Sequence, residues 1–84
     1  MSTGTELRQG PRRNTAIEAV IVFDSGRRRM GCIVRNVSDG GAKLEVEKVI
    51  GVPNSFDLFA PGLGRQSCRV VWRALRELGV QFIG

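Results

Sequence analysis

Residues 28–47 of the chain read RRMGCIVRNVSDGGAKLEVE, and this stretch decides the fold. Two runs with an alternating pattern, 28–36 and 42–47, flank a cluster of Ser, Asp and Gly at 38–41. Alternation with a period of two is typical of a β-strand with one buried face, and the cluster is typical of a tight turn. The stretch therefore predicts two antiparallel strands. Their buried face is expected to hold Met30, Cys32, Val34, Ala42, Leu44 and Val46.

Four further strands are predicted on either side of this pair. Residues 16–23, AIEAVIVF, are rich in β-branched and aromatic side chains, and residues 24–27 have the composition of a turn. A short strand at about 56–60, a longer one at about 65–74 and a last one through Phe82 follow, with turn residues between them.

Residues 69–78, RVVWRALREL, allow two interpretations. Their apolar spacing also suits an amphipathic helix, whereas the run Val70-Val71-Trp72 and the alternation around it favour a strand. We adopt the strand. It would place Cys68, Val70 and Trp72 on one face.

Short strands and regularly spaced turns, in a chain with 11 glycines, predict an all-β fold, a small six-stranded antiparallel β-barrel. Closure removes the edges that a small open sheet would expose. A chain of 84 residues has room for one domain with a modest core. We expect residues 15–84 to form the barrel and the polar residues 1–14 to form a flexible basic N-terminal arm.

The composition argues against an enzyme and against a metal site. The chain has no histidine and its eight carboxylates form no evident pair, so the usual groups for acid–base and nucleophilic catalysis are missing. Two thiols without histidine are also too few ligands for zinc. We expect Cys32 and Cys68 to be buried apolar residues rather than a disulfide, and we expect no cofactor.

The sequence also bears on location. No apolar run approaches the roughly 18–20 residues that a membrane-spanning helix needs. The N-terminus has no apolar segment of the kind found in secretory signals. A cytoplasmic location is therefore predicted.

The formal charge is +5, and 11 of the 13 basic residues are arginine. Arginine presents a planar fork of donors that matches phosphate groups and guanine edges, so an anionic partner is expected. A small barrel that binds nucleic acid usually exposes aromatic side chains for base stacking. Most of the four Phe and the one Trp fall at positions expected to face the core, so a nucleic-acid-binding barrel is the weaker alternative.

Two polar segments stand out from this framework. Residues 8–12, RQGPR, lie on the arm, and residues 36–41, NVSDGG, join the second and third predicted strands. Taken alone, the first has the composition of a solvated basic tail and the second that of an ordinary strand connection. Composition by itself leaves these interpretations open.

Together, the two segments resemble the signature of the PilZ domain family. The first matches an RxxxR motif, and the second matches a [D/N]xSxxG motif at the start of a barrel strand. Residues 68–82, CRVVWRALRELGVQF, are similar to the closing strands of the short stand-alone members. The five motif positions are Arg8, Arg12, Asn36, Ser38 and Gly41.

The resemblance implies a bacterial receptor domain for cyclic di-GMP with a split-barrel fold. The five motif residues would then bind the ligand, with arginine reading guanine edges and phosphates. Asn36 and Ser38 would leave one face of their strand to hydrogen-bond a guanine edge, and Gly41 would allow the turn and the approach of the ligand. Arg13 and Arg35 would add phosphate contacts. The family often has aspartate at position 36, and an amide donates as well as accepts.

The polar 14-residue arm, which carries half of this site, predicts a mechanism. The arm would fold over the bound nucleotide and change the surface offered to a downstream protein partner. We expect a minimal version of the fold, without the C-terminal helix that many members pack against the barrel. The alternative within the family is a ligand-blind adaptor that acts only through protein contacts.

Overall fold

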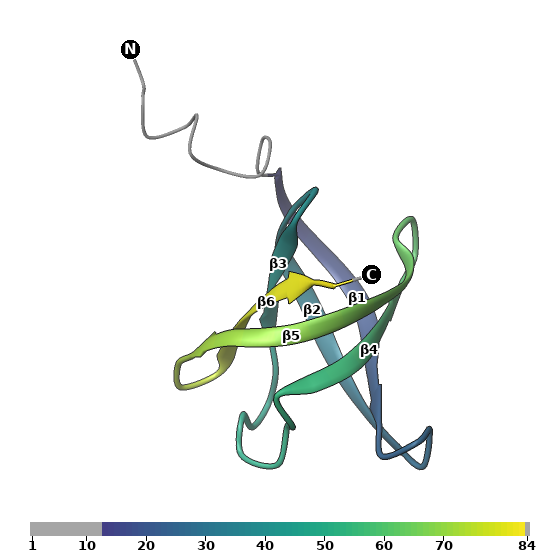
Figure 1. Ribbon diagram of the computed structural model, residues 1–84. Helices are drawn as coiled ribbons and strands as arrows, with labels where there is room; N and C mark the ends of the chain where they lie inside the picture. The colour runs from purple at the N-terminus through teal and green to yellow at the C-terminus, as the bar shows by residue number, and fades with distance from the viewer. Residues whose placement is uncertain (1–12, 84) are drawn as a thin grey trace.

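Six antiparallel strands form the part of the chain that the computed structural model describes, residues 13–83. Their order around the closed barrel is β1-β2-β3-β6-β5-β4 (Figure 1). The predicted six-stranded antiparallel β-barrel is therefore confirmed. The strands are β1 (Arg13–Phe23), β2 (Arg28–Ser38), β3 (Gly41–Glu45), β4 (Ser55–Ala60), β5 (Gly64–Arg73) and β6 (Glu77–Phe82).

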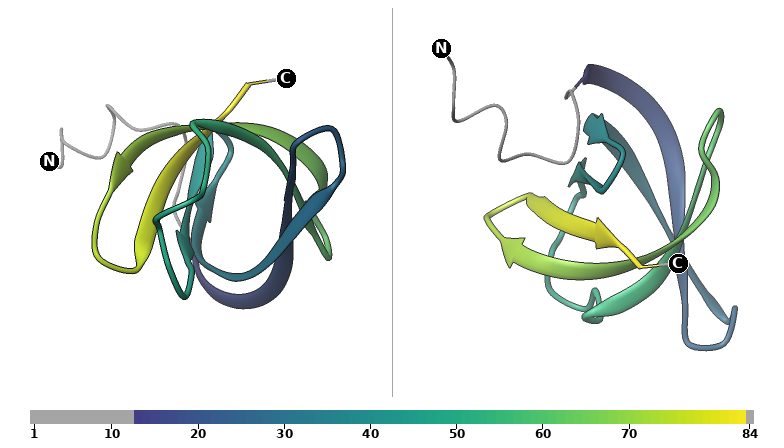
Figure 2. Two further views of the ribbon diagram at one scale, coloured as in Figure 1. Left: turned by 90° about the horizontal axis from the view of Figure 1, so that it is seen from below. Right: turned by 45° about the horizontal axis from the view of Figure 1, so that its top comes forward.

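The strands curl around one interior, as the two further views of the ribbon show (Figure 2). Apolar side chains fill this interior, and along β2, β3 and β4 they alternate with less buried ones. Among the described residues, no polar or charged residue is buried. Five of the six residues that the alternation of residues 28–47 predicts to be buried are buried, and Met30 packs partly buried against the same core. Both cysteines are free and buried, as predicted. The largest fully buried side chains are those of Ile21, Leu44, Leu58, Leu78, Val34 and Cys68.

Strand β1 is longer than the sequence predicts. It begins at Arg13, three residues before the expected start at residue 16. Arg13 pairs with Val37 of β2, and Asn14 pairs with Asn36. Residues 13 and 14, which the sequence assigned to the arm, thus belong to the barrel sheet because they extend the ladder between β1 and β2.

Three irregularities interrupt the ladders, and each re-aims side chains as β-bulges do. Two of them meet at Arg35, where the register of β2 shifts against β1 and against β3. The hydroxyl of Thr15, in the shifted part of β1, donates to the carbonyl oxygen of Val34. Val34 and Val37 are both buried, so the alternation of inward and outward side chains along β2 shifts by one residue between them. Asn36 and Ser38 consequently face outward.

The third irregularity lies in β5. Val70 pairs with Val80 and Trp72 pairs with Gly79, so Val71 is the extra residue. The prediction that Trp72 shares a face with Cys68 is wrong, because this bulge turns Trp72 outward and leaves it 44% exposed.

Residues 69–78 form the end of β5, a turn and the start of β6, as the strand interpretation predicts. The helical interpretation of this segment is excluded. Nowhere in residues 13–83 is there a helix with the length and apolar character needed to cross a membrane.

Candidate ligand-binding site

The three described residues of the second motif lie together at the β2–β3 hairpin. Ser38 ends β2 and pairs with Gly41, the first residue of β3, and Asn36 lies two residues earlier on the same outward side. Strand β1 begins beside this hairpin (Figure 1). Arg8 and Arg12 lie outside the described residues.

Asn36 and Ser38 present their polar groups close to the sheet surface. The Asn36 amide nitrogen, Nδ2, donates to Oδ1 of Asn14 across the β1–β2 ladder at 3.0 Å. The Ser38 hydroxyl lies 3.5 Å from the carbonyl oxygen of Gly41, which is the long limit of a hydrogen bond. The hydroxyl can therefore rotate towards another acceptor or donor at little cost.

Position 41 requires glycine for a structural reason that differs from the expected one. Its φ is not in the left-handed region, so it is not needed for the turn itself. A Cβ on Gly41 would lie 2.2 Å from the backbone oxygen of Val80 in β6. Position 41 therefore excludes any side chain because the backbone of β6 passes directly over it.

Cross-strand pairing extends the motif over a wider outer surface, which we call the motif face. One row of paired residues crosses β2, β3, β6 and β5, and a second row runs beside it. The first row is Asn36, Lys43, Gly79 and Trp72. The second row is Ser38, Gly41, Gln81 and Arg69.

Three polar residues of this face were missed from the sequence: Lys43, Gln81 and Arg69. Lys43 pairs with Asn36. Its outward direction could have been predicted from the alternation of β3, because the next residue, Leu44, is buried. Gln81 and Arg69 belong to distant strands, and only the pairing of β3 with β6 brings them to the motif. Arg69 donates from Nη2 to Oε1 of Gln81 at 3.2 Å.

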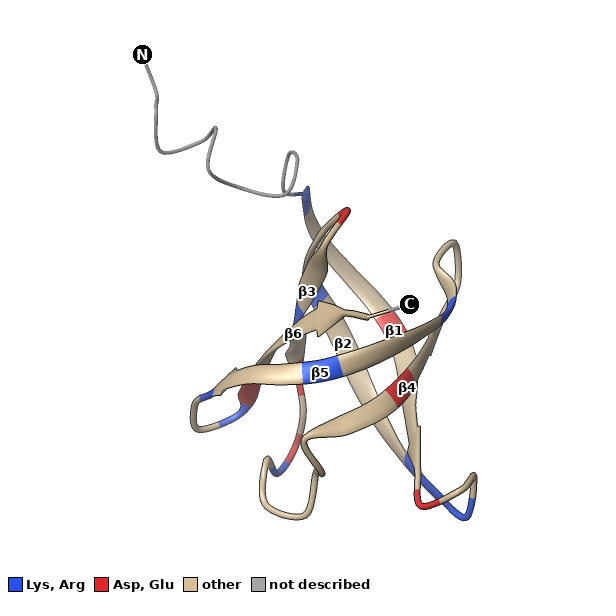
Figure 3. Ribbon diagram, in the orientation of Figure 1, with Lys and Arg blue, Asp and Glu red and all other residues tan. Residues whose placement is uncertain are grey.

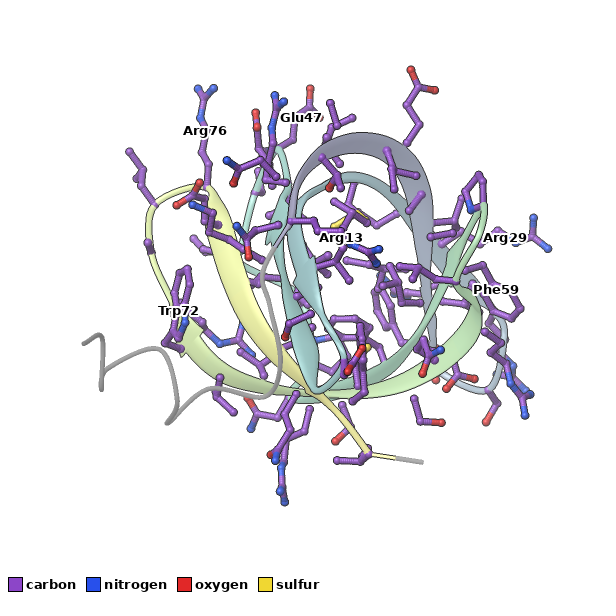
Figure 4. All side chains as sticks on the ribbon, turned by 90° about the horizontal axis from the view of Figure 1, so that it is seen from above. Arg13, Arg29, Glu47, Phe59, Trp72 and Arg76 are labelled. Carbon is purple, nitrogen blue, oxygen red and sulfur yellow. The ribbon has the colours of Figure 1, made fainter. Side chains whose placement is uncertain are left out.

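The two additional arginines point elsewhere. Arg13 pairs with the buried Val37, so its side chain leaves β1 towards the axis of the barrel and is exposed at the barrel end (Figure 4). Arg35 forms an ion pair with Glu45, with Nε 2.6 Å from Oε1. Neither side chain lies in the two rows of the motif face.

Charge is unevenly distributed over the barrel surface. Lys and Arg lie on β3 and β5, whereas acidic residues lie midway along β1 and β4 (Figure 3). On the motif face, Nζ of Lys43 is 3.8 Å from Oε2 of Glu77, too far for a hydrogen bond, and both side chains are more than a third exposed. This face is therefore suited to an anion that carries further hydrogen-bonding groups.

The motif face is an outer sheet surface rather than a pocket. A hollow of about 620 Å³ lies beside β1, β2 and the chain after β3, and one of about 940 Å³ lies between the β1–β2 turn and β4. Neither is lined by Asn36, Ser38 or Gly41. A small ligand on the motif face would need a second wall to bury it.

The described residues offer little to support covalent chemistry. Burial raises the pKa of Cys32 to about 11, and burial together with Asp57 and Cys32 raises the pKa of Cys68 to about 12. Both thiols are therefore protonated at neutral pH and weak nucleophiles. Within residues 13–83, no three side chains of His, Cys, Asp or Glu gather as metal ligands would.

Comparison with known proteins agrees with the motif and the fold. A family model described as "PilZ domain" matches residues 6–84, which is nearly the whole chain and includes both motifs. A search of curated proteins finds no match. The chain belongs to the PilZ domain family, a family of cyclic di-GMP receptor domains.

Proposed function

We propose that this protein is a cytoplasmic bacterial receptor for cyclic di-GMP that signals to a partner protein and performs no catalysis. The observation that carries the proposal is the placement of Asn36, Ser38 and Gly41 on one outer face, next to the start of β1. The residues of the RxxxR motif precede that strand in the sequence.

The connection to the arm is short. Arg13 pairs with Val37, which lies between Asn36 and Ser38 in β2. A fully extended chain spans at most about 3.6 Å per residue, so covalent connectivity keeps Arg8 within about 18 Å of Arg13. Both motif arginines are therefore able to reach the motif face, and the arm supplies the second wall that this face needs.

Each group has a chemical role in the proposed complex. Asn36 and Ser38 hydrogen-bond a guanine edge, since they offer donors and acceptors on one side of β2. Arg8 and Arg12 donate paired hydrogen bonds to guanine or phosphate. Arg13 and Arg35 are secondary phosphate contacts. Arg35 would first have to break its ion pair with Glu45.

Binding is coupled to ordering of the arm. The arm closes over the nucleotide and thereby presents a new surface to the partner protein. An NMR titration with cyclic di-GMP tests this step. The amide signals of residues 6–14 should shift together with those of the β2–β3 hairpin, and arm signals that stay unchanged while the hairpin responds would refute it.

Calorimetry with cyclic di-GMP tests the receptor function itself. We expect binding by the unmodified chain, and affinity at least about tenfold weaker for Arg8→Ala and for Arg12→Ala, because each loses hydrogen bonds to a charged partner. Arg65→Ala is the matched control, since Arg65 is exposed at the start of β5 and pairs with Phe59, away from the motif face. No heat with the unmodified chain would favour the ligand-blind adaptor or the nucleic-acid-binding barrel.

A further inference from the structure

The two most exposed large apolar side chains among the described residues lie on neighbouring turns. Ile50, between β3 and β4, and Leu75, between β5 and β6, are each 86% exposed. The antiparallel strand order places both connections at the barrel end away from the β2–β3 hairpin, where they lie side by side (Figure 1, Figure 2). One exposed apolar side chain is ordinary on a protein surface, but two on adjacent turns call for an explanation.

The turn between β3 and β4 holds Ile50 at its tip. The backbone amide of Val52 donates to the carbonyl oxygen of Val49 at 3.2 Å, and Gly51 has a φ of 95°. A positive φ at the third of the four residues is typical of a type II turn, which favours glycine there. Val52 is only 4% exposed and Val49 packs against the core, so both ends of the turn are anchored. The exposure of Ile50 is therefore set by the fold.

Hydrogen bonds join this turn to the one between β5 and β6. The guanidinium of Arg73 donates from Nη1 to the carbonyl oxygen of Val49 at 3.3 Å and from Nη2 to Oδ1 of Asn54 at 2.8 Å. The backbone amide of Val46 donates to the carbonyl oxygen of Arg76 at 2.8 Å. The two turns thus form one unit, which we call the loop edge. It consists of residues 46–54 and 73–76.

Positive charge surrounds both apolar tips of the loop edge (Figure 3). Lys48 lies two residues before the first tip, and Arg76 directly follows the second. Arg73 links the two turns, and all three cations are exposed. Glu47 is the only carboxylate in the two segments, so the loop edge has a net positive charge. The partner that fits it is therefore anionic and also accepts apolar side chains.

The shape of the loop edge favours a lipid bilayer over other anionic partners. A stable protein interface buries about 800 Å² on each partner, whereas the loop edge presents two narrow convex tips. Proteins that bind single-stranded nucleic acid stack bases on aromatic side chains, and both tips here are aliphatic. A fluid bilayer closes around separate tips. Its interface accepts apolar side chains, while its anionic headgroups attract Lys and Arg.

We propose that the loop edge docks the protein on the surface of an anionic lipid bilayer. Ile50 and Leu75 enter the interface, and the three cations around them contact lipid phosphates. The β2–β3 hairpin and the start of β1 lie at the other end of the barrel, so the motif residues of that hairpin stay open to solvent in the docked protein. Docking is thus independent of the proposed receptor function and compatible with it.

Phe59 provides a matched control for exposed apolar surface. It is 43% exposed, and it lies across the barrel from Arg76 of the loop edge (Figure 4). Serine in place of Ile50, Leu75 or Phe59 removes an exposed apolar side chain and leaves the net charge unchanged. Differences among these variants are therefore not due to the attraction between the many arginines of the chain and anionic lipid.

Co-sedimentation with vesicles tests the docking. The unmodified chain should sediment with vesicles of phosphatidylethanolamine and phosphatidylglycerol, and much less with phosphatidylcholine, which has no net charge. Ile50→Ser and Leu75→Ser should each lower the partition coefficient by about 3- to 10-fold, and the double variant by about 10- to 100-fold, because apolar area leaves the interface. Phe59→Ser should match the unmodified chain. A thermal melt of each variant shows that it is folded.

Substitution of the cations tests the second half of the proposal. Lys48→Ala and Arg76→Ala should each weaken vesicle binding by roughly 2- to 5-fold, and added salt should reduce this difference.

Three outcomes would overturn the docking proposal. The unmodified chain does not sediment with the anionic vesicles, or it binds a DNA duplex and not the vesicles. The folded double variant sediments as well as the unmodified chain. Phe59→Ser loses as much binding as the double variant, which would place the contact elsewhere on the barrel. Loss of binding in the double variant, with Phe59→Ser unaffected, supports the loop edge as the docking surface.

Discussion

The motif face and the opposite side of the barrel differ in how much side chain they carry. On the side over β1 and β4, which we call the apolar face, Val20, Val22 and Phe59 point outward, so β1 is apolar on both sides. On the motif face, Gly41 and Gly79 leave backbone bare and polar side chains surround them. The comparison teaches that close packing over glycine distinguishes the face that carries the motif, because Gly31 on the opposite side has nothing within 4 Å of an added Cβ.

The largest effect should come from filling the space at Gly41. Gly41→Ala would push a Cβ against the backbone oxygen of Val80, and β3 and β6 would have to separate. We expect a loss of about 1–3 kcal/mol in the free energy of unfolding, measured by urea denaturation. Gly31→Ala is the control on the apolar face, where nothing lies within 4 Å of the added atom. It should be neutral or stabilising, and equal losses at both positions would contradict the comparison.

Gly79→Ala should change the surroundings of Trp72 with little effect on the stability of the barrel. The added Cβ would displace the indole of Trp72, which is a side chain that can swing away, so the free energy of unfolding should change by less than about 1 kcal/mol. The tryptophan emission should shift to longer wavelength, because the displaced indole becomes more exposed to water. Unchanged emission would mean that the ring does not rest on Gly79.

The sequence predicts the barrel well because alternation and turn residues are local signals. The buried faces of β2 and β3 follow directly from the pattern that ends in AKLEVE. The bulges at Arg35 and Val71 are not visible in that pattern, because one inserted residue changes parity without changing composition. This is why Trp72 was wrongly assigned to the core-facing side.

The candidate site was only half accessible to sequence reasoning. The resemblance supplied Asn36, Ser38 and Gly41, and the structure brings all three to one hairpin. The partners of Gly41 and Lys43 in β6 depend on which strands become neighbours around the barrel, and local patterns do not encode that order. The backbone contact that requires glycine at position 41 therefore could not be inferred from its motif.

A smaller effect is expected from charge on the motif face. Lys43→Ala should weaken binding of cyclic di-GMP by roughly 2- to 5-fold, because an exposed cation near a phosphate contributes modestly and is screened by salt. Calorimetry at low and high salt should show that the difference shrinks as ionic strength rises. Arg65→Ala also removes one cation, but beside the apolar face, and should leave the affinity unchanged. Equal losses from both variants would indicate a general effect of net charge.

The interior that both faces share should respond to pH only in the alkaline range. Burial raises the pKa of Cys68 to about 12 and that of Cys32 to about 11, from an ordinary value of 9.0. Above pH 9 the unfolded chain releases thiol protons that the folded chain retains. The contribution of the two thiols to the free energy of unfolding therefore falls between about pH 9 and pH 12 and is constant below that window.

Urea denaturation from pH 7 to pH 11 measures this dependence. Cys68→Ala should start less stable at neutral pH because a small cavity replaces the sulfur, and its stability should decline less steeply above pH 9. Gly31→Ala, which keeps both thiols, is the control variant for this measurement. If Cys68→Ala and Gly31→Ala decline with the same slope, the thiol of Cys68 is not the group that makes the core sensitive to alkali.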